Sequence, residues 1–313
     1  MSHAEVICPS CKHGQARWIG EIPPSNLFAG RALDQVLHGG GLWVCQNCNL
    51  YFRWPCLPTN KLDQLYRDGS SETWEGDPLS RTDWRKAEQW LGKNLSPGDC
   101  VLDIGCATGD FLSSVLEGKF QKYGIEINVD AAQKAKSTGV NILGSNFAEV
   151  VHNYEGKQVF SAITAFDVIE HFPDPLAFLR NCTKLLKPGG RILVSTGNSE
   201  ALTWRLSGAR YWYCTLPEHI TFINKNWCNY ASQVLELKLE KVYTFAHVRS
   251  GFFRRVGELV LNGTSLLSPS LFKTLRRVGF GGKEVKLYPG LIDSPPNWRT
   301  AKDHLLVEWK YCK

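Results

Sequence analysis

Short apolar runs alternate with stretches of helical periodicity between residues 100 and 195. Strands are predicted at Val101–Leu102, Tyr123–Ile127 and Phe160–Ala165, where each run ends in a polar residue or a turn. Leu185–Ser195 combines a helix end, a Pro-Gly-Gly turn and a further strand. This alternation predicts a parallel sheet with helices on both faces.

The pattern continues with a helix at Lys225–Leu235 and strands at Leu239–Val248 and Asp303–Lys310. Residues 249–286 are left as an insertion before the last strand. Its apolar residues recur at helical spacing, which predicts two amphipathic helices whose apolar faces resemble core. The first face holds Phe252, Phe253, Val256, Leu259 and Val260, and the second holds Leu271, Phe272, Leu275 and Val278.

Two Cys-x-x-Cys pairs mark a first section, residues 1–58, ahead of a helical linker or cap at 59–95 and a larger domain at 96–313. Four thiolates in two such pairs are the usual tetrahedral ligands of structural zinc, which predicts a zinc-ribbon-like domain with one zinc ion. Four ordinary reduced cysteines are the alternative, and His13, His38 or Cys56 could replace one ligand. The predicted ligands are Cys8, Cys11, Cys45 and Cys48.

A turn of small residues follows the strand that ends at Asp103. Gly105, Ala107 and Gly109 let the backbone approach a ligand closely before a helix begins. Their spacing differs from the dinucleotide-binding G-x-G-x-x-G pattern, so a dinucleotide site is not predicted. Glu126 ends the second strand, where an acid can accept hydrogen bonds from ribose hydroxyls.

These blocks resemble the motifs of class I S-adenosylmethionine-dependent methyltransferases, in the subgroup typified by the ubiquinone-biosynthesis O-methyltransferases. Residues 101–111 resemble motif I, and residues 170–175 and 187–191 are especially close to later motifs. The resemblance covers about residues 96–240 and implies an α/β fold with a doubly wound, mostly parallel seven-stranded sheet. It also implies S-adenosyl-L-methionine as cofactor, held by Asp103, Gly105, Cys106, Ala107, Gly109, Phe111, Glu126, Ile127, Ser145, Asn146, Phe147, Phe166, Asp167, Val168 and His171.

The chain departs from many relatives after the third strand, where no acid is present to accept the adenine amino group. Ser145 or the side-chain carbonyl of Asn146 could accept that hydrogen bond, and Phe147 could pack on the ring. In the resemblance, helices before motif I close over the methionine end of the cofactor. Candidates for that contact are Tyr66, Trp74 and Arg81, with packing between domains as the alternative.

A hydroxyl acceptor needs a base near the transferred methyl group. His171 follows the fourth strand at the ligand-binding edge, although it could instead only line the cofactor pocket. His219 is the other candidate base, with Glu218 as its orienting partner. The aromatic loop before it is expected to shape the acceptor pocket or to form a hydrophobic lid, through Tyr211, Trp212 and Tyr213.

The net charge of +6 is concentrated in residues 249–286, which hold eight basic and two acidic residues. Such a patch favours an anionic small-molecule acceptor, gripped by Arg254, Arg255, Arg276 and Arg277, or else forms a solvated face. The odd cysteine count of 11 and the lack of a basic-then-apolar N-terminus predict a cytoplasmic protein. The sequence contains no run of eighteen apolar residues, so no transmembrane segment is predicted.

These features together favour a methyltransferase acting on a small or medium-sized acceptor, such as a sugar, a polysaccharide precursor or another secondary metabolite. A ribosomal or other RNA methyltransferase is an alternative, because the basic insertion could follow phosphates. A non-catalytic cofactor-binding assembly protein is a third hypothesis, against which the intact Asp103, Gly105, Gly109 and Glu126 argue.

Overall fold

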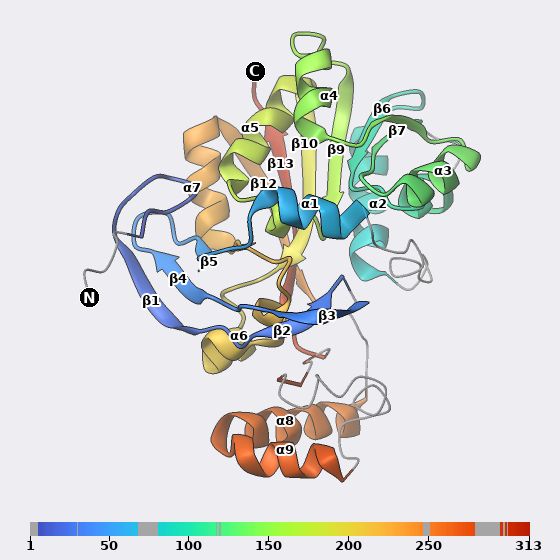
Figure 1. Cartoon of the computed structure of the whole chain (residues 1–313). Coiled ribbons are helices and arrows are strands. Elements are labelled where there is room, and N and C mark those ends of the chain that lie inside the picture. Colours follow the sequence, from blue (N-terminus) through green and yellow to red (C-terminus); the bar gives the residue numbers. More distant parts are fainter. Residues whose placement is uncertain are drawn as a thin grey trace.

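A computed structural model describes residues 6–29, 31–67, 81–116, 118, 120–246, 251–278, 295, 296, 298 and 300–313. Its centre is a seven-stranded sheet in the order β12-β13-β10-β9-β6-β7-β8 (Figure 1). The strands are β6 (Cys100–Ile104), β7 (Gln121–Ile125), β8 (Asn141–Gly144), β9 (Phe160–Phe166), β10 (Leu186–Gly197), β12 (Leu237–Phe245) and β13 (His304–Tyr311).

Neighbouring strands pair in parallel along the part of the sheet with the order β10-β9-β6-β7-β8. β13 runs antiparallel to both of its neighbours, β10 and β12. The predicted doubly wound α/β fold is therefore confirmed. Every residue of β9 is buried, because helices cover the sheet on both faces. That double cover explains why this strand does not alternate between apolar and exposed polar residues: even its polar members, Ser161 and Thr164, are buried and hydrogen-bonded.

Helices α2 and α3 contribute to the hydrophobic core on one face of the sheet, and α4, α5 and α7 contribute to the core on the other. Side-chain caps fix several helix starts: Asn128 accepts from the Ala131 N–H, and Asp174 accepts from the Leu176 N–H. The helices are α1 (Thr59–Arg67), α2 (Thr82–Asn94), α3 (Val129–Ser137), α4 (Phe147–Tyr154), α5 (Pro175–Leu185), α6 (Leu202–Ser207), α7 (Lys225–Leu235), α8 (Phe252–Leu267) and α9 (Pro269–Arg277).

A second sheet joins the N-terminal section to the rest of the chain. It has the order β1-β4-β5-β11, and β2 and β3 form a separate hairpin. β11 comes from beyond residue 200, so the larger domain supplies the last strand of the N-terminal sheet. The strands are β1 (Ala16–Glu21), β2 (Ser25–Phe28), β3 (Arg31–Leu37), β4 (Gly41–Cys45), β5 (Tyr51–Trp54) and β11 (Thr221–Phe222).

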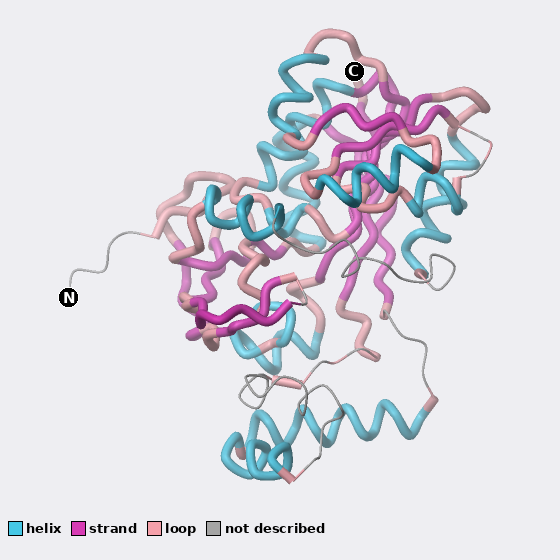
Figure 2. The backbone as a smooth tube through the Cα atoms, turned by 45° about the vertical axis from the view of Figure 1, so that its right-hand side comes forward, coloured by secondary structure: helices cyan, strands magenta, loops and turns pink. Residues whose placement is uncertain are grey.

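The insertion forms the two predicted helices, α8 and α9, which pack against each other away from the main sheet (Figure 2). The expectation that their apolar faces are core is wrong for most of these side chains. Phe253 is 89% exposed and Leu259 is 57% exposed, whereas Asn262 and Ser265 are buried. Within the described residues, no helix is both long enough and apolar enough to cross a membrane.

Candidate cofactor and acceptor site

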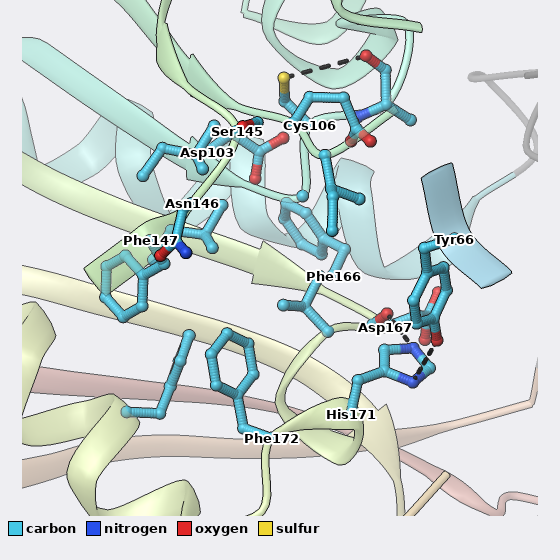
Figure 3. A pocket seen from close by; sticks show the side chains of 18 of the residues that line it. Tyr66, Asp103, Cys106, Ser145, Asn146, Phe147, Phe166, Asp167, His171 and Phe172 are labelled. Carbon is cyan, nitrogen blue, oxygen red and sulfur yellow. Dashed lines mark hydrogen bonds between the residues drawn. The ribbon is translucent and has the colours of Figure 1, made fainter. Parts of the chain in front are cut away.

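A cavity of about 840 Å³ opens at the carboxyl ends of β6, β7 and β9, where open α/β sheets bind ligands (Figure 3). Its volume suits a molecule of cofactor size. Most of the predicted cofactor residues line it: Asp103, Gly105, Cys106, Ala107, Glu126, Ile127, Ser145, Asn146, Phe147, Phe166, Asp167, Val168 and His171.

The small-residue turn has a backbone that larger residues could not adopt. Gly105 has a φ of +69°, and a Cβ there would lie 2.6 Å from Val168 Cγ2. Glu126 holds the turn, because its carboxylate accepts the Ala107 and Asn128 N–H groups, each at 2.8 Å. Burial raises the pKa of Glu126, against the effect of these hydrogen bonds.

Asp103 is buried at the base of the same cavity and accepts a hydrogen bond from the Thr164 hydroxyl at 2.7 Å. Burial raises the pKa of Asp103 to about 7, although the Thr164 bond opposes that shift. A cationic sulfonium or ammonium group in the cavity would favour its ionised form.

Two predicted cofactor contacts do not reach the cavity. Phe111 is fully buried, with its ring centroid 5.7 Å from that of Trp84 and 4.6 Å from that of Phe166. Gly109, with a φ of +80°, lets the turn pack closely on α3 and Val140 instead of lining the pocket. Both residues therefore support the turn on its core side, away from the cavity.

Asn146 lines the cavity, but its side-chain carbonyl caps α4. Its Oδ1 accepts the Ala148 N–H at 2.8 Å and the Glu149 N–H at 3.4 Å. An amide oxygen has two lone pairs, so the predicted additional bond to adenine has no acceptor site left on this atom. Ser145 keeps the role of adenine acceptor as a prediction.

The two helices before β6 bring Tyr66 and Arg81 to the cavity wall, as predicted, while Trp74 lies outside the described residues. Arg81 bridges Asp83 at 2.6 Å and Asp167 at 2.7 Å. Burial alone would lower the pKa of Arg81, but the two carboxylates outweigh it and raise the pKa. The buried Asp83 also accepts from the Ser195 hydroxyl, a link that no local motif indicates.

His171 lies at the cavity wall beside Tyr66 (Figure 3). Its Nδ1 is 2.8 Å from the Tyr66 hydroxyl oxygen and 3.0 Å from the Glu218 carbonyl oxygen. Its Nε2 is 3.2 Å from the Asp167 carbonyl oxygen. The imidazole is thus fixed in orientation at the surface of the pocket, as a group that moves protons requires.

His219 and Glu218 lie behind His171 and do not line the cavity, so base catalysis by His219 stays a prediction that the described lining does not support. The His219 Nδ1 donates to the Tyr213 carbonyl oxygen at 3.0 Å, and burial lowers the pKa of His219 well below its usual value. Glu218 does not orient His219, because its carboxylate accepts the Ala29 N–H at 2.9 Å.

The aromatic loop also packs inward. Tyr211 is 1% exposed and donates its hydroxyl hydrogen to Asp303, and Tyr213 donates to Glu170 at 2.5 Å. Glu170, which the sequence did not single out, also accepts from the Thr196 hydroxyl. A carboxylate oxygen of Glu170 and a ring nitrogen each of His171 and His219 lie within 4.8 Å of one another, as metal ligands could. The hydrogen bonds of Glu170 instead make these residues a polar network in the core. This inward packing of the aromatic loop agrees with the alternative of a hydrophobic lid.

Arg53 of β5 is a further residue that the sequence does not reveal. Only 3% exposed, it donates to the carbonyl oxygens of Gly39, Cys214, Leu216 and His219, the last at 3.0 Å. Burial lowers the pKa of Arg53 to about 10, so it remains a cation at neutral pH. One side chain of the N-terminal section therefore holds the loop whose Glu218 carbonyl contacts His171.

Replacing Arg53 with Met is expected to lower kcat and thermal stability while sparing S-adenosylmethionine affinity, because several buried carbonyls lose a charged donor. Each such bond contributes roughly 1.5–3 kcal/mol. Arg53→Lys should recover much of the melting temperature but little kcat, since an ammonium has fewer and less spread donors. Arg17→Met, on exposed β1, is the matched control. If Arg53→Met loses the expected stability but keeps the wild-type kcat, the role of Arg53 is only structural.

The four predicted metal ligands converge. The Sγ atoms lie 3.6 Å apart for Cys8 and Cys48 and 3.5 Å apart for Cys11 and Cys45, and all four lie within 4.8 Å of one another. A tetrahedral ion with Zn–S bonds of about 2.3 Å needs sulfur separations of about 3.8 Å. The Cys48 thiol lowers the pKa of Cys8 to about 5, although burial opposes it. This donor set therefore fits zinc.

The basic insertion does not reach the cavity, whose described lining contains none of its residues. Arg276 is 9% exposed, and its guanidinium lies 4.6 Å from the centroid of the Phe272 ring. This packing argues against a grip of Arg276 on an anionic acceptor, which stays a prediction.

The fold is that of Rossmann-like methyltransferases, and part of the chain is similar to them in sequence. Residues 80–233 match a methyltransferase domain family. The ubiquinone biosynthesis O-methyltransferase of Serratia proteamaculans (strain 568) is 30% identical over 124 residues, which are 38% of this chain and 52% of that protein. The Yersinia pestis (strain Pestoides F) protein of the same name is 31% identical over 126 residues, covering 38% and 51%.

A chain in the complex between the Haloferax volcanii Trm112 methyltransferase activator and a methyltransferase has a similar fold. Its TM-score is 0.52 at 15% identity, over 80% of this chain and 97% of that one. The present chain spans about half the length of the curated relatives it matches. These matches show similarity to methyltransferase domains in sequence over about half of the chain and in fold over most of it.

Proposed function

We propose that this protein transfers the methyl group of S-adenosylmethionine to a hydroxyl group of a small or medium-sized acceptor. The observation that carries the proposal is the placement of His171 and Tyr66 on the wall of the cavity that Asp103 and Glu126 line. A cofactor of this size suits the cavity of about 840 Å³, and Glu126 offers a carboxylate for ribose hydroxyls.

The cofactor supplies an activated methyl group, so the protein must mainly align the reacting atoms. Asp103 and Glu126 bind the cofactor, while Arg81 and Tyr66 close the cavity at its other side. His171 Nδ1 takes up the hydroxyl proton of the acceptor through the Tyr66 hydroxyl, which gives its own hydrogen to Nδ1 as it receives that of the acceptor. The relatives' printed name, which contains O-methyltransferase, agrees with a hydroxyl acceptor. Phenols, sugars, polysaccharide precursors and other secondary metabolites are the acceptor classes.

His171→Asn is expected to lower kcat by about 10²–10⁴-fold with little change in cofactor affinity, as loss of a general base does. Transfer would be followed with tritiated cofactor against a panel of phenols and sugar nucleotides, and cofactor binding by calorimetry. His152→Asn, on the exposed side of α4, is the control. An unchanged kcat in His171→Asn would reject the base, and no cofactor binding by the wild type would reject the function.

We also propose that Cys8, Cys11, Cys45 and Cys48 hold one structural zinc ion. Their converging sulfurs and close spacing support it. Four thiolates leave no open coordination position, so the ion stabilises the fold and takes no part in methyl transfer.

A further inference from the structure

The helical hairpin α8–α9 carries an unusual share of the exposed apolar surface. Of sixteen large hydrophobic side chains exposed in the described part of the chain, eight lie between residues 252 and 278. Six of the eight are aliphatic. They are Phe252, Phe253, Val256, Leu259, Val260, Leu267, Leu271 and Val278. Clustered exposed apolar residues mark interaction surfaces, whereas scattered ones are ordinary.

Basic side chains accompany this apolar surface. Arg254, Arg255 and Arg277 are exposed on the same two helices. Glu258, the one acid of α8, accepts the Thr300 N–H at 2.9 Å and hydroxyl at 2.7 Å with one oxygen, and the Arg254 Nε–H at 3.4 Å with the other. The surface therefore presents apolar and positively charged groups with little opposing charge.

The hairpin leaves the sheet at the edge that carries the cavity. β12 ends at Phe245, which pairs with His304 of β13, and His304 pairs with Gly197 at the carboxyl end of β10. The cavity opens at that same edge, at the carboxyl ends of β6 and β9. Figure 1 places α8 and α9 beyond this end of the sheet.

We propose that α8–α9 docks on the surface of an anionic lipid bilayer. An amphipathic helix with Phe and Leu beside Arg lies in the membrane interface, where acyl chains take up the apolar side chains and anionic headgroups pair with the cations. The hairpin lies outside residues 80–233, the part of the chain that matches the methyltransferase domain family. Docking would bring the cavity edge toward the bilayer.

The same surface fits other partners less well. A second copy would bring two positively charged faces together, which repels. RNA would pair with the arginines and could stack on Phe252 and Phe253, but the aliphatic side chains that form most of the patch offer nothing to a base.

Sedimentation of the full chain with vesicles tests the proposal. We expect binding to phosphatidylcholine vesicles containing roughly a third phosphatidylglycerol, and much weaker binding to phosphatidylcholine alone. Arg254→Gln with Arg255→Gln should weaken binding by about 30-fold, which equals about 2 kcal/mol, since each basic residue contributes about 1 kcal/mol. Phe253→Ser with Val260→Ser should weaken it at least as much.

Leu202→Ser with Leu206→Ser is the matched control, because these α6 side chains are 70% and 62% exposed outside the hairpin. All variants should keep the wild-type affinity for S-adenosylmethionine, which shows that they fold. Absence of binding to anionic vesicles, or equal binding to neutral ones, would overturn the proposal. Two other results would also overturn it, if vesicle binding is absent. One is tight, salt-dependent RNA binding that is lost with Phe253→Ser and Val260→Ser, and the other is a dimer that is lost with the same substitutions.

Discussion

Glu126→Ala is expected to reduce the affinity for S-adenosylmethionine at least tenfold. Loss of hydrogen bonds to a charged acceptor costs roughly 1.5–3 kcal/mol, and about 1.4 kcal/mol corresponds to each tenfold change. The variant also leaves the Ala107 and Asn128 N–H groups without their acceptor, so the turn that carries the cofactor loosens. Calorimetric titration with the cofactor and with its demethylated product measures the effect.

Glu149→Ala is the matched control, because this carboxylate is exposed on the neighbouring α4. Glu126→Gln separates the two contributions, since its amide retains one oxygen for a backbone N–H and loses the charge. Its affinity should fall between those of the wild type and Glu126→Ala. Cofactor binding that is unchanged in Glu126→Ala would show that ribose is held elsewhere.

The central sheet was predictable because each of its strands carries its own signal. β9 is buried on both faces and is mostly apolar in sequence. The turns after β6 and before the second half of β10 contain the glycines that their backbones need. Most of the cofactor residues follow from the same local order, since parallel strands bring their carboxyl ends to one edge.

The groups around His171 were not predictable in the same way, because their partners are distant in the sequence. Arg53 bonds to carbonyls about 160 residues away, and Glu170 bonds to Tyr213 and Thr196. His219 looked like a base by residue type alone. Its burial and its bond to the Tyr213 carbonyl come from tertiary packing, which no spacing in the sequence expresses.

Helical periodicity likewise gave α8 and α9 but not the environment of their apolar faces. An amphipathic pattern states which residues share a face and leaves open what covers that face. In α8 the buried side holds Asn262 and Ser265, and the apolar side chains face outward. The periodicity alone predicted that this face is part of the core, because most apolar helix faces in globular proteins are buried there.

Loss of the proposed zinc ion is expected to unfold the N-terminal section and to stop methyl transfer, although cofactor binding should persist. Structural zinc contributes roughly 10–16 kcal/mol to small cysteine modules. Three contacts carry the damage into the larger domain. β5 pairs with β11, Arg53 holds the loop that contacts His171, and the Trp227 indole donates to Ser10 at 3.3 Å. β6, which bears Asp103, also packs on a second core with α2 and α3 that contains no residue of the N-terminal section, so the cofactor site keeps that support.

Cys45→Ser tests this directly, because Cys45 is one of the buried members of the cluster. Metal analysis of wild-type protein purified without added zinc should return about one equivalent, as a closed tetrahedral site predicts. The variant should lose that metal, its melting transition and its turnover, yet bind S-adenosylmethionine in calorimetry. Cys56→Ser controls for the alternative ligand and should retain zinc, since Cys56 lies outside the converging set. A metal-free wild type that is fully folded would contradict the zinc site, and lost cofactor binding in Cys45→Ser would show that the two parts fold as one.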